Sequence, residues 1–241
     1  MMTLDLAIRL TEILLGLAFF LQSIEHIHAP TNEQILFLPR IILSVLLMLG
    51  FQTQWVCLAL VILGLFILRR FQGPYNGGSD RMSLLVLCCL TLVKFMPTIQ
   101  WQEYIFGYLA VQLVLSYYIS GWVKIVNPQW RKGRALQDVF RFSAYPVSES
   151  LRAWADRPRL LFVMSWAVMS FELLFPLTLF TQPTLILGLA IAATFHFTNA
   201  CLFGLNRFFW VWLAAYPSII WLQERIFSTD IVFDMISGLL A

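Results

Sequence analysis

Three residues inside or beside the apolar runs of this chain could carry chemistry: Lys124, Glu172 and His196. A charged group in a bilayer costs at least about 2.5–3.5 kcal/mol on insertion scales, so each one needs a partner or a function. Lys124 ends a long apolar run in YYISGWVKIVNPQW, residues 117–130. Its amine could act as a base at a buried site, or it could extend to the headgroups and anchor the helix.

Glu172 lies in the middle of its run, in MSFELLFPL, shortly before Pro176. A carboxylate at that depth is paired or protonated, which leaves a structural partner and a functional group as two interpretations. His196 lies in ATFHFTNACLFG, with Asn199 on the same helical face. A neutral imidazole bound across helices would suffice there. A quinone, haem or proton-transfer site is the alternative, with haem the weakest because it would need a second histidine at matching depth.

The other charges in the apolar runs have simpler interpretations. Arg9 and Glu12 are spaced i, i+3 and should form an ion pair that faces the bundle or lines a polar cavity. Arg40 lies near the start of the second run and Lys94 near the end of another, and both could snorkel to the interface.

Histidines and cysteines do not indicate a metal site. His26 and His28 do not share a helical face, so SIEHIH predicts a polar turn at the interface. The four cysteines lie inside apolar runs without a C-x-x-C pair, and we expect small buried hydrophobes at Cys57, Cys88, Cys89 and Cys201.

The composition indicates a membrane protein. Hydrophobic residues make up 60% of the chain and charged residues only 12%, whereas a soluble domain carries about 25% charged residues. We therefore expect an all-α integral membrane protein with the lipid bilayer as its main surroundings. The net charge of +3 is small and argues against a nucleic-acid partner. The first run carries charges and lacks a small-residue cleavage site, so we expect a retained helix rather than a signal peptide.

Apolar runs long enough to cross a bilayer predict a polytopic bundle of seven or eight transmembrane helices. The number depends on GFQTQW, which either divides residues 35–68 into a helical hairpin or lies within one long tilted helix. On the hairpin interpretation the spans are 5–23, 34–51, 54–69, 82–98, 101–124, 159–181, 184–204 and 207–223.

Residues 127–158 are the one sizeable polar stretch and predict interfacial helices. In WRKGRALQDVF, one helical face carries the apolar side chains and the other carries the charges. The apolar face consists of Ala135, Leu136, Val139 and Phe140. A last amphipathic segment, residues 226–241, is expected at the membrane surface.

Basic residues gather on one side of this predicted topology, which the positive-inside rule places in the cytoplasm. A bacterial inner membrane is the expected compartment. These residues are Lys124, Arg131, Lys132, Arg134, Arg141, Arg152, Arg157, Arg159 and Arg207, with Arg69, Arg70 and Arg81 in the adjoining loop.

The order of these landmarks resembles the HTTM (horizontally transferred transmembrane) family, which includes the membrane part of vitamin K-dependent gamma-carboxylase. YYISGWVKIVNPQWRKGRAL is similar to a family segment with an aromatic run, a small residue, Gly121, Lys124, Trp130 and Gly133. NGGSDRMSLLV, FELLFPL and HFTNACLFGLNRFFWVWLAAYPSIIW also stand in the family's order. The resemblance implies a single transmembrane domain over residues 1–241.

The resemblance also implies a role for Lys124, which matches the lysine regarded in the carboxylase as the base that deprotonates vitamin K hydroquinone. A quinone is therefore the candidate cofactor. The carboxylase has a histidine where this chain reads NGGSD, at 76–80. It also has a large lumenal domain, which we do not expect in this protein. We do not expect glutamate carboxylation by this chain alone.

Three functions follow from these observations. The first is an accessory subunit or maturation factor that acts with a membrane-protein partner or an exported peptide. The alternative is a quinone-linked membrane enzyme with Lys124 as base and with Glu172 and His196 lining a cavity. Transport is the third, although no pair of matched broken helices is evident. The enzyme hypothesis requires that the three residues converge on one cavity open to the bilayer.

Overall fold

The computed structural model describes residues 2–28, 31–70, 78–142 and 149–227, and over these ranges it is helical without strands. The contacts group the chain into two compact units. The first runs from the N-terminus to Val111 and resumes at Arg207, and the second is Gln112–Asn206. The all-α architecture predicted from composition is confirmed.

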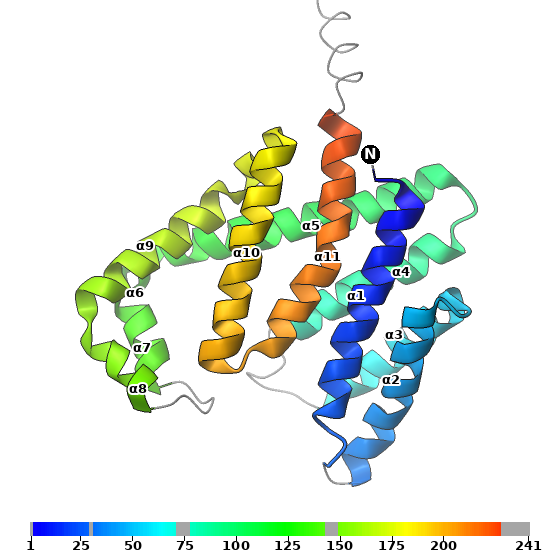
Figure 1. The fold of residues 1–241 in the computed structure, drawn as a ribbon, viewed down its shortest axis with the longest axis horizontal. Helices are drawn as coiled ribbons and strands as arrows, with labels where there is room; N and C mark the ends of the chain where they lie inside the picture. Colours follow the sequence, from blue (N-terminus) through cyan, green and yellow to red (C-terminus); the bar gives the residue numbers. More distant parts are fainter. Residues whose placement is uncertain (1, 29–30, 71–77, 143–148, 228–241) are drawn as a thin grey trace, which may run out of the picture. The chain divides into compact units, whose positions relative to one another are not determined.

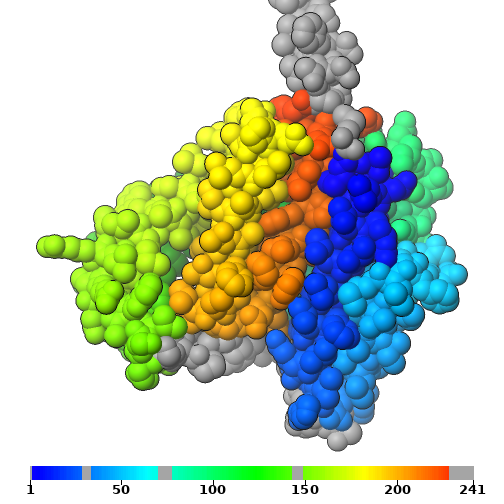
Figure 2. Space-filling model, viewed as in Figure 1, coloured from blue at the N-terminus to red at the C-terminus, as the bar shows by residue number. Residues whose placement is uncertain are grey.

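The first unit contains α1 (Leu4–Ile24), α2 (Thr31–Leu49), α3 (Thr53–Arg70), α4 (Gly78–Phe95), the start of α5 (Ile99–Val126) and α11 (Asn206–Phe227). Helix α1 lies along α2 (Figure 1), and their side chains are in contact in the space-filling view (Figure 2). A Cβ atom on Gly16 would lie 2.7 Å from Met48 Cγ and 3.0 Å from the Ser44 carbonyl oxygen. The absence of a side chain at Gly16 therefore lets the two helices approach closely.

The segment GFQTQW separates two helices, so the predicted hairpin is confirmed and a single tilted helix is excluded. Gly50 has φ +80° and Gln52 has φ +45°, both in the left-handed region. Such a backbone cannot continue a right-handed helix.

The second unit contains the rest of α5, then α6 (Pro128–Arg131), α7 (Arg134–Phe142), α8 (Glu149–Arg152), η1 (Ala153–Asp156), α9 (Pro158–Leu174), η2 (Phe175–Phe180) and α10 (Gln182–Phe203). The described part of the polar stretch 127–158, which leaves out residues 143–148, is mostly helical, as predicted. Its place at the membrane surface stays a prediction. Its predicted apolar face is only partly buried: Phe140 packs against Leu161 and Phe203, whereas Val139 is exposed.

Eight helices match the eight predicted spans in position. Within the part of the chain that the structure describes, three are long and apolar enough to cross a membrane: Ile99–Val126, Pro158–Phe180 and Gln182–Phe203. The apolar stretches of α2 and α3 are shorter, at Gln34–Leu49 and Thr53–Arg69. The number of transmembrane helices, seven or eight, therefore stays a prediction. The predicted amphipathic segment 226–241 falls outside the described residues from 228 onward.

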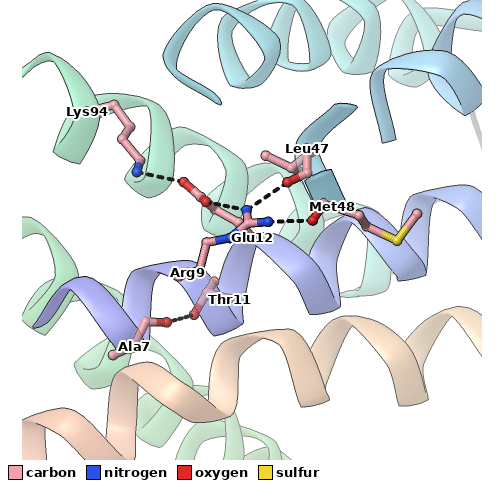
Figure 3. Close-up of polar contacts among 7 residues, drawn as sticks. All are labelled: Ala7, Arg9, Thr11, Glu12, Leu47, Met48 and Lys94. Atoms are coloured by element: carbon pink, nitrogen blue, oxygen red, sulfur yellow. Dashed lines mark hydrogen bonds and ion pairs between the residues drawn. The ribbon is translucent and has the colours of Figure 1, made fainter. Parts of the chain in front are cut away.

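Charged residues of the first unit form a cluster on α1 (Figure 3). The predicted ion pair is confirmed, because Arg9 Nη1 lies 2.8 Å from Glu12 Oε2. Lys94 Nζ lies 2.8 Å from Glu12 Oε1, so the snorkelling predicted for Lys94 is wrong. Arg9 also donates to the carbonyl oxygens of Leu47 and Met48, which end α2. The cluster therefore joins α1, α2 and α4.

Arg40 does not snorkel either. Its side chain is buried at 6% exposure, and its guanidinium carbon lies 4.1 Å from the centroid of the Phe19 ring. A second ring, Phe37, lies 6.0 Å away. Cation–π contact with an aromatic face compensates part of the cost of burying the charge, which is why this residue stays inside the unit.

Candidate functional site

Lys124 and Glu172 form an ion pair in the second unit. Lys124 Nζ lies 2.6 Å from Glu172 Oε2 and 2.7 Å from Oε1. Ser120 joins the pair, because its Oγ accepts a hydrogen bond from Lys124 Nζ at 2.6 Å and donates to Glu172 Oε1 at 3.2 Å. The side chain of Lys124 is 16% exposed and that of Glu172 is 5% exposed. Such an ammonium–carboxylate pair is neutral overall, so it can lie within an apolar bundle.

Gly121 makes this pair possible. A Cβ atom at this position would lie 2.8 Å from the backbone nitrogen of Leu173 and 3.0 Å from Glu172 Cβ. Real Cβ atoms do not approach so closely, so only glycine lets α5 and α9 meet here. The close approach of the two backbones brings the carboxylate of α9 to the amine of α5.

His196 binds the same helix. Its Nε2 lies 3.0 Å from Tyr117 Oη, and both residues are buried. Tyr117 also contacts two rings of the segment that carries Glu172: Phe171 at 6.2 Å and Phe175 at 4.2 Å between centroids. The histidine therefore has a phenol as a partner across helices, which fits the interpretation of an imidazole bound across helices.

One face of α5 connects all of these contacts. Tyr117, Ser120, Gly121 and Lys124 are spaced i, i+3, i+4 and i+7, so they lie on the same side of the helix. Lys124 and Glu172 are in direct contact, and His196 meets the same face through Tyr117. The structure thus brings the three candidate residues to one face of one helix, with His196 bound to that face through Tyr117.

The sequence analysis missed Tyr117 and Ser120. The spacing of Ser120 from Lys124 was a usable signal, because a hydroxyl one helical turn before a lysine in an apolar run can bind its amine. Trp130 is a further neighbour, with Lys124 Nζ 5.5 Å from its ring centroid. This cation–π contact anchors the lysine at the end of α5.

Other chemistry-bearing residues lie elsewhere. His26 stacks on Phe37 at 3.9 Å, and its Nε2 lies 3.0 Å from Arg207 Nη2, which fits the predicted polar turn. Cys57 and Cys89 are buried as predicted. The burial predicted for Cys201 is wrong, because this side chain is exposed on α10. Within the described ranges, no three histidine, cysteine, aspartate or glutamate side chains are grouped to hold a metal ion.

Comparison with known proteins gives a family but no close relative. A model of the HTTM domain matches residues 6–223. No curated protein and no solved structure matches the chain. The matched region spans most of the sequence and includes Lys124, Glu172 and His196, together with the apolar helices expected of an integral membrane protein. The chain therefore belongs to the HTTM domain family of transmembrane proteins.

Proposed function

We propose that this protein is a membrane enzyme that removes a proton from a lipid-soluble substrate with a weakly acidic hydroxyl, such as a hydroquinone. The observation that carries the proposal is the contact between Lys124 and Glu172 on the α5 face that also binds His196 through Tyr117. Ionisable groups inside a membrane are costly, and they are retained where they serve a function.

The pair divides the work of proton removal between its two members. The Glu172 carboxylate accepts the proton of the substrate hydroxyl, which leaves a substrate oxyanion and a neutral carboxylic acid. Protonation of Glu172 weakens the ion pair between Lys124 and the carboxylate. The Lys124 ammonium can then stabilise the substrate oxyanion. The resemblance implies that Lys124 itself is the base. Because its amine is bound to a carboxylate, we assign the proton acceptor to Glu172.

The surroundings of Glu172 support a flat, apolar substrate. Phe171 and Phe175 flank the glutamate on its own segment, and their ring centroids are 5.8 Å apart in an edge-to-face arrangement. Tyr117 packs against Phe175 from α5, with 4.2 Å between the ring centroids. Aromatic walls bind ring systems by offset stacking and edge contacts, which suits a quinone better than a peptide.

An accessory role remains the second candidate, and exposed apolar side chains on α9 and α10 favour it. These faces can be covered by lipid or by the helix of a partner membrane protein. The exposed side chains include Phe162, Val163, Leu174, Ile186, Leu187, Ile191 and Phe197.

Purification from native membranes separates the two candidates. The wild type is compared with Lys124→Met, Glu172→Gln and the control Lys132→Met, whose side chain is exposed. Mass spectrometry then identifies co-purifying quinones and proteins. The enzyme proposal expects a quinone with the wild type and the control but not with the two site variants. A partner protein at equal abundance, without a quinone, would favour the accessory role. A protein without either companion would count against both.

A further inference from the structure

A small cavity lies in the first unit, apart from the Lys124–Glu172 pair. Its free volume is about 30 Å³, and side chains of α1, α2, α3 and α4 line it. Two or more waters, or one group of similar size, need about this much space. Most of the wall is apolar, including Leu60, Leu84 and Leu87, but Arg40 and Asp80 also face it.

Each of these two charged residues has a polar atom without a partner. Among the residues that the structure describes, Arg40 Nη1 and Asp80 Oδ2 are buried and make no hydrogen bond. Arg40 is only 6% exposed. Leaving a buried charged group unsatisfied costs more than the 1–3 kcal/mol typical of a neutral one. The cavity therefore suits a group that accepts a hydrogen bond from Arg40 and donates one to Asp80.

The charge around the cavity is positive. Arg40 and Arg207 both interact with the Asp80 carboxylate, which also accepts a hydrogen bond from Gln22. His26 Nε2 lies 3.0 Å from Arg207 Nη2. Two guanidinium groups and one carboxylate leave a net charge of about +1, which favours an anion over a cation.

We propose that this cavity binds a phosphate-type anion that carries a neighbouring hydroxyl. Arg40 donates to a phosphate oxygen, because guanidinium and phosphate form strong charge-assisted hydrogen bonds. The hydroxyl donates to Asp80 Oδ2. The phosphate is either the headgroup of an anionic glycerophospholipid, whose chains follow the apolar wall, or a free hydrogen phosphate ion. This site does not depend on the proposed function, since it lies in the other unit and uses other residues.

The test measures anion binding to the full-length purified protein in dodecyl maltoside. One arm titrates phosphatidylglycerol against phosphatidylcholine and counts bound lipids by native mass spectrometry. The other arm titrates inorganic phosphate against chloride at equal ionic strength and follows thermal unfolding. Binding of the lipid alone assigns a lipid site, and binding of both assigns a phosphate site that also accepts the free ion. Failure of both anions to bind overturns the proposal.

Three variants test the geometry. Arg40→Met should weaken binding about tenfold to a hundredfold, because one charge-assisted contact is lost. Arg81→Gln is the matched control, since Arg81 follows Asp80 on α4 but is exposed, and it should change binding less than about twofold. Equal losses in both variants would show surface attraction only and overturn the site.

Asp80→Asn tests the same site through its second charged side chain, and this test does not require that Arg40→Met folds. The amide keeps an acceptor oxygen and removes the negative charge, so anion affinity should hold or rise. A loss of binding of about tenfold or more in Asp80→Asn would contradict an anion site.

Discussion

Lys124 Nζ lies 2.6 Å from Glu172 Oε2 although the two residues are far apart in the chain. Each explains how the other can lie within an apolar bundle. Glu172, in the middle of a membrane-type helix, has the partner that its depth requires. The Lys124 amine donates hydrogen bonds to that partner and to Ser120.

The first prediction concerns this pair. Lys124→Met and Glu172→Gln should each lower the free energy of unfolding by about 2–4 kcal/mol, because each leaves a buried charge without its partner. The double variant should lose less than the sum of the two. A double-mutant cycle of thermal unfolding in detergent measures the coupling. Additive losses would mean that the pair is not formed in the folded protein.

The second prediction concerns the glycine beneath the pair. Gly121→Ala should destabilise the protein by about 1–3 kcal/mol, because the added methyl group overlaps the Leu173 backbone. Gly107→Ala is the control on the same helix, since its Cβ atom would lie 3.6 Å from the nearest side chain. It should be neutral or stabilising by up to about 1 kcal/mol through helix propensity. Equal unfolding temperatures for the two variants would contradict the close approach of α5 and α9.

The third prediction concerns Tyr117 and His196. Tyr117→Phe removes the hydroxyl that bonds His196 Nε2 and should cost about 1 kcal/mol of stability. It should also change the ¹⁵N chemical shift of the imidazole, which reports the bonding of that nitrogen. Tyr118→Phe is the control, because its side chain is 41% exposed. An unchanged imidazole spectrum in Tyr117→Phe would refute the contact.

The fourth prediction concerns the cluster on α1. Glu12→Gln removes the carboxylate between Arg9 and Lys94 and leaves two cations facing each other. We expect a loss of about 1–3 kcal/mol, with Arg9→Met costing a similar amount because it also frees the last carbonyl groups of α2. Glu25→Gln, an exposed change at the end of α1, should have little effect in the same unfolding assay. A similar loss for Glu25→Gln would show that the cluster has no special role.

The fifth prediction concerns orientation. If the segment rich in basic residues faces the cytoplasm, a cysteine at Asp138 should be protected from an impermeant maleimide in intact spheroplasts. A cysteine at Gln100 should be modified. Both positions are exposed, so accessibility of the side chain itself does not limit either reaction. The opposite labelling pattern would invert the topology.

Helix positions were readable from the sequence because length and hydropathy set them. The hairpin at Gly50–Gln52 is one example, since a glycine and three polar residues, Gln52, Thr53 and Gln54, interrupt an otherwise apolar run. The partners of the intramembrane charges were not readable in the same way. Nothing in the residues around Glu172 states which helix faces it, and the decisive contact depends on the close approach at Gly121.

The direction of the Arg40 side chain was also not readable from the sequence. Its distance from the helix end allowed snorkelling, but the rotation of α2 turns the side chain toward Phe19 instead. Sequence patterns give the depth of a residue along a helix better than its direction. The direction of a side chain depends on packing between helices. This packing buries Arg40 and pairs Lys94 with Glu12.

The most direct test of the proposed function follows the proton on Glu172. Menadiol, a small naphthohydroquinone, is added to the purified protein, and difference infrared spectroscopy monitors carboxyl groups. Our account predicts that a band of a newly protonated carboxyl group appears in the wild type and in the exposed control Glu149→Gln, and is absent from Glu172→Gln. The same band in Glu172→Gln, or no band in the wild type with menadiol bound, would contradict it.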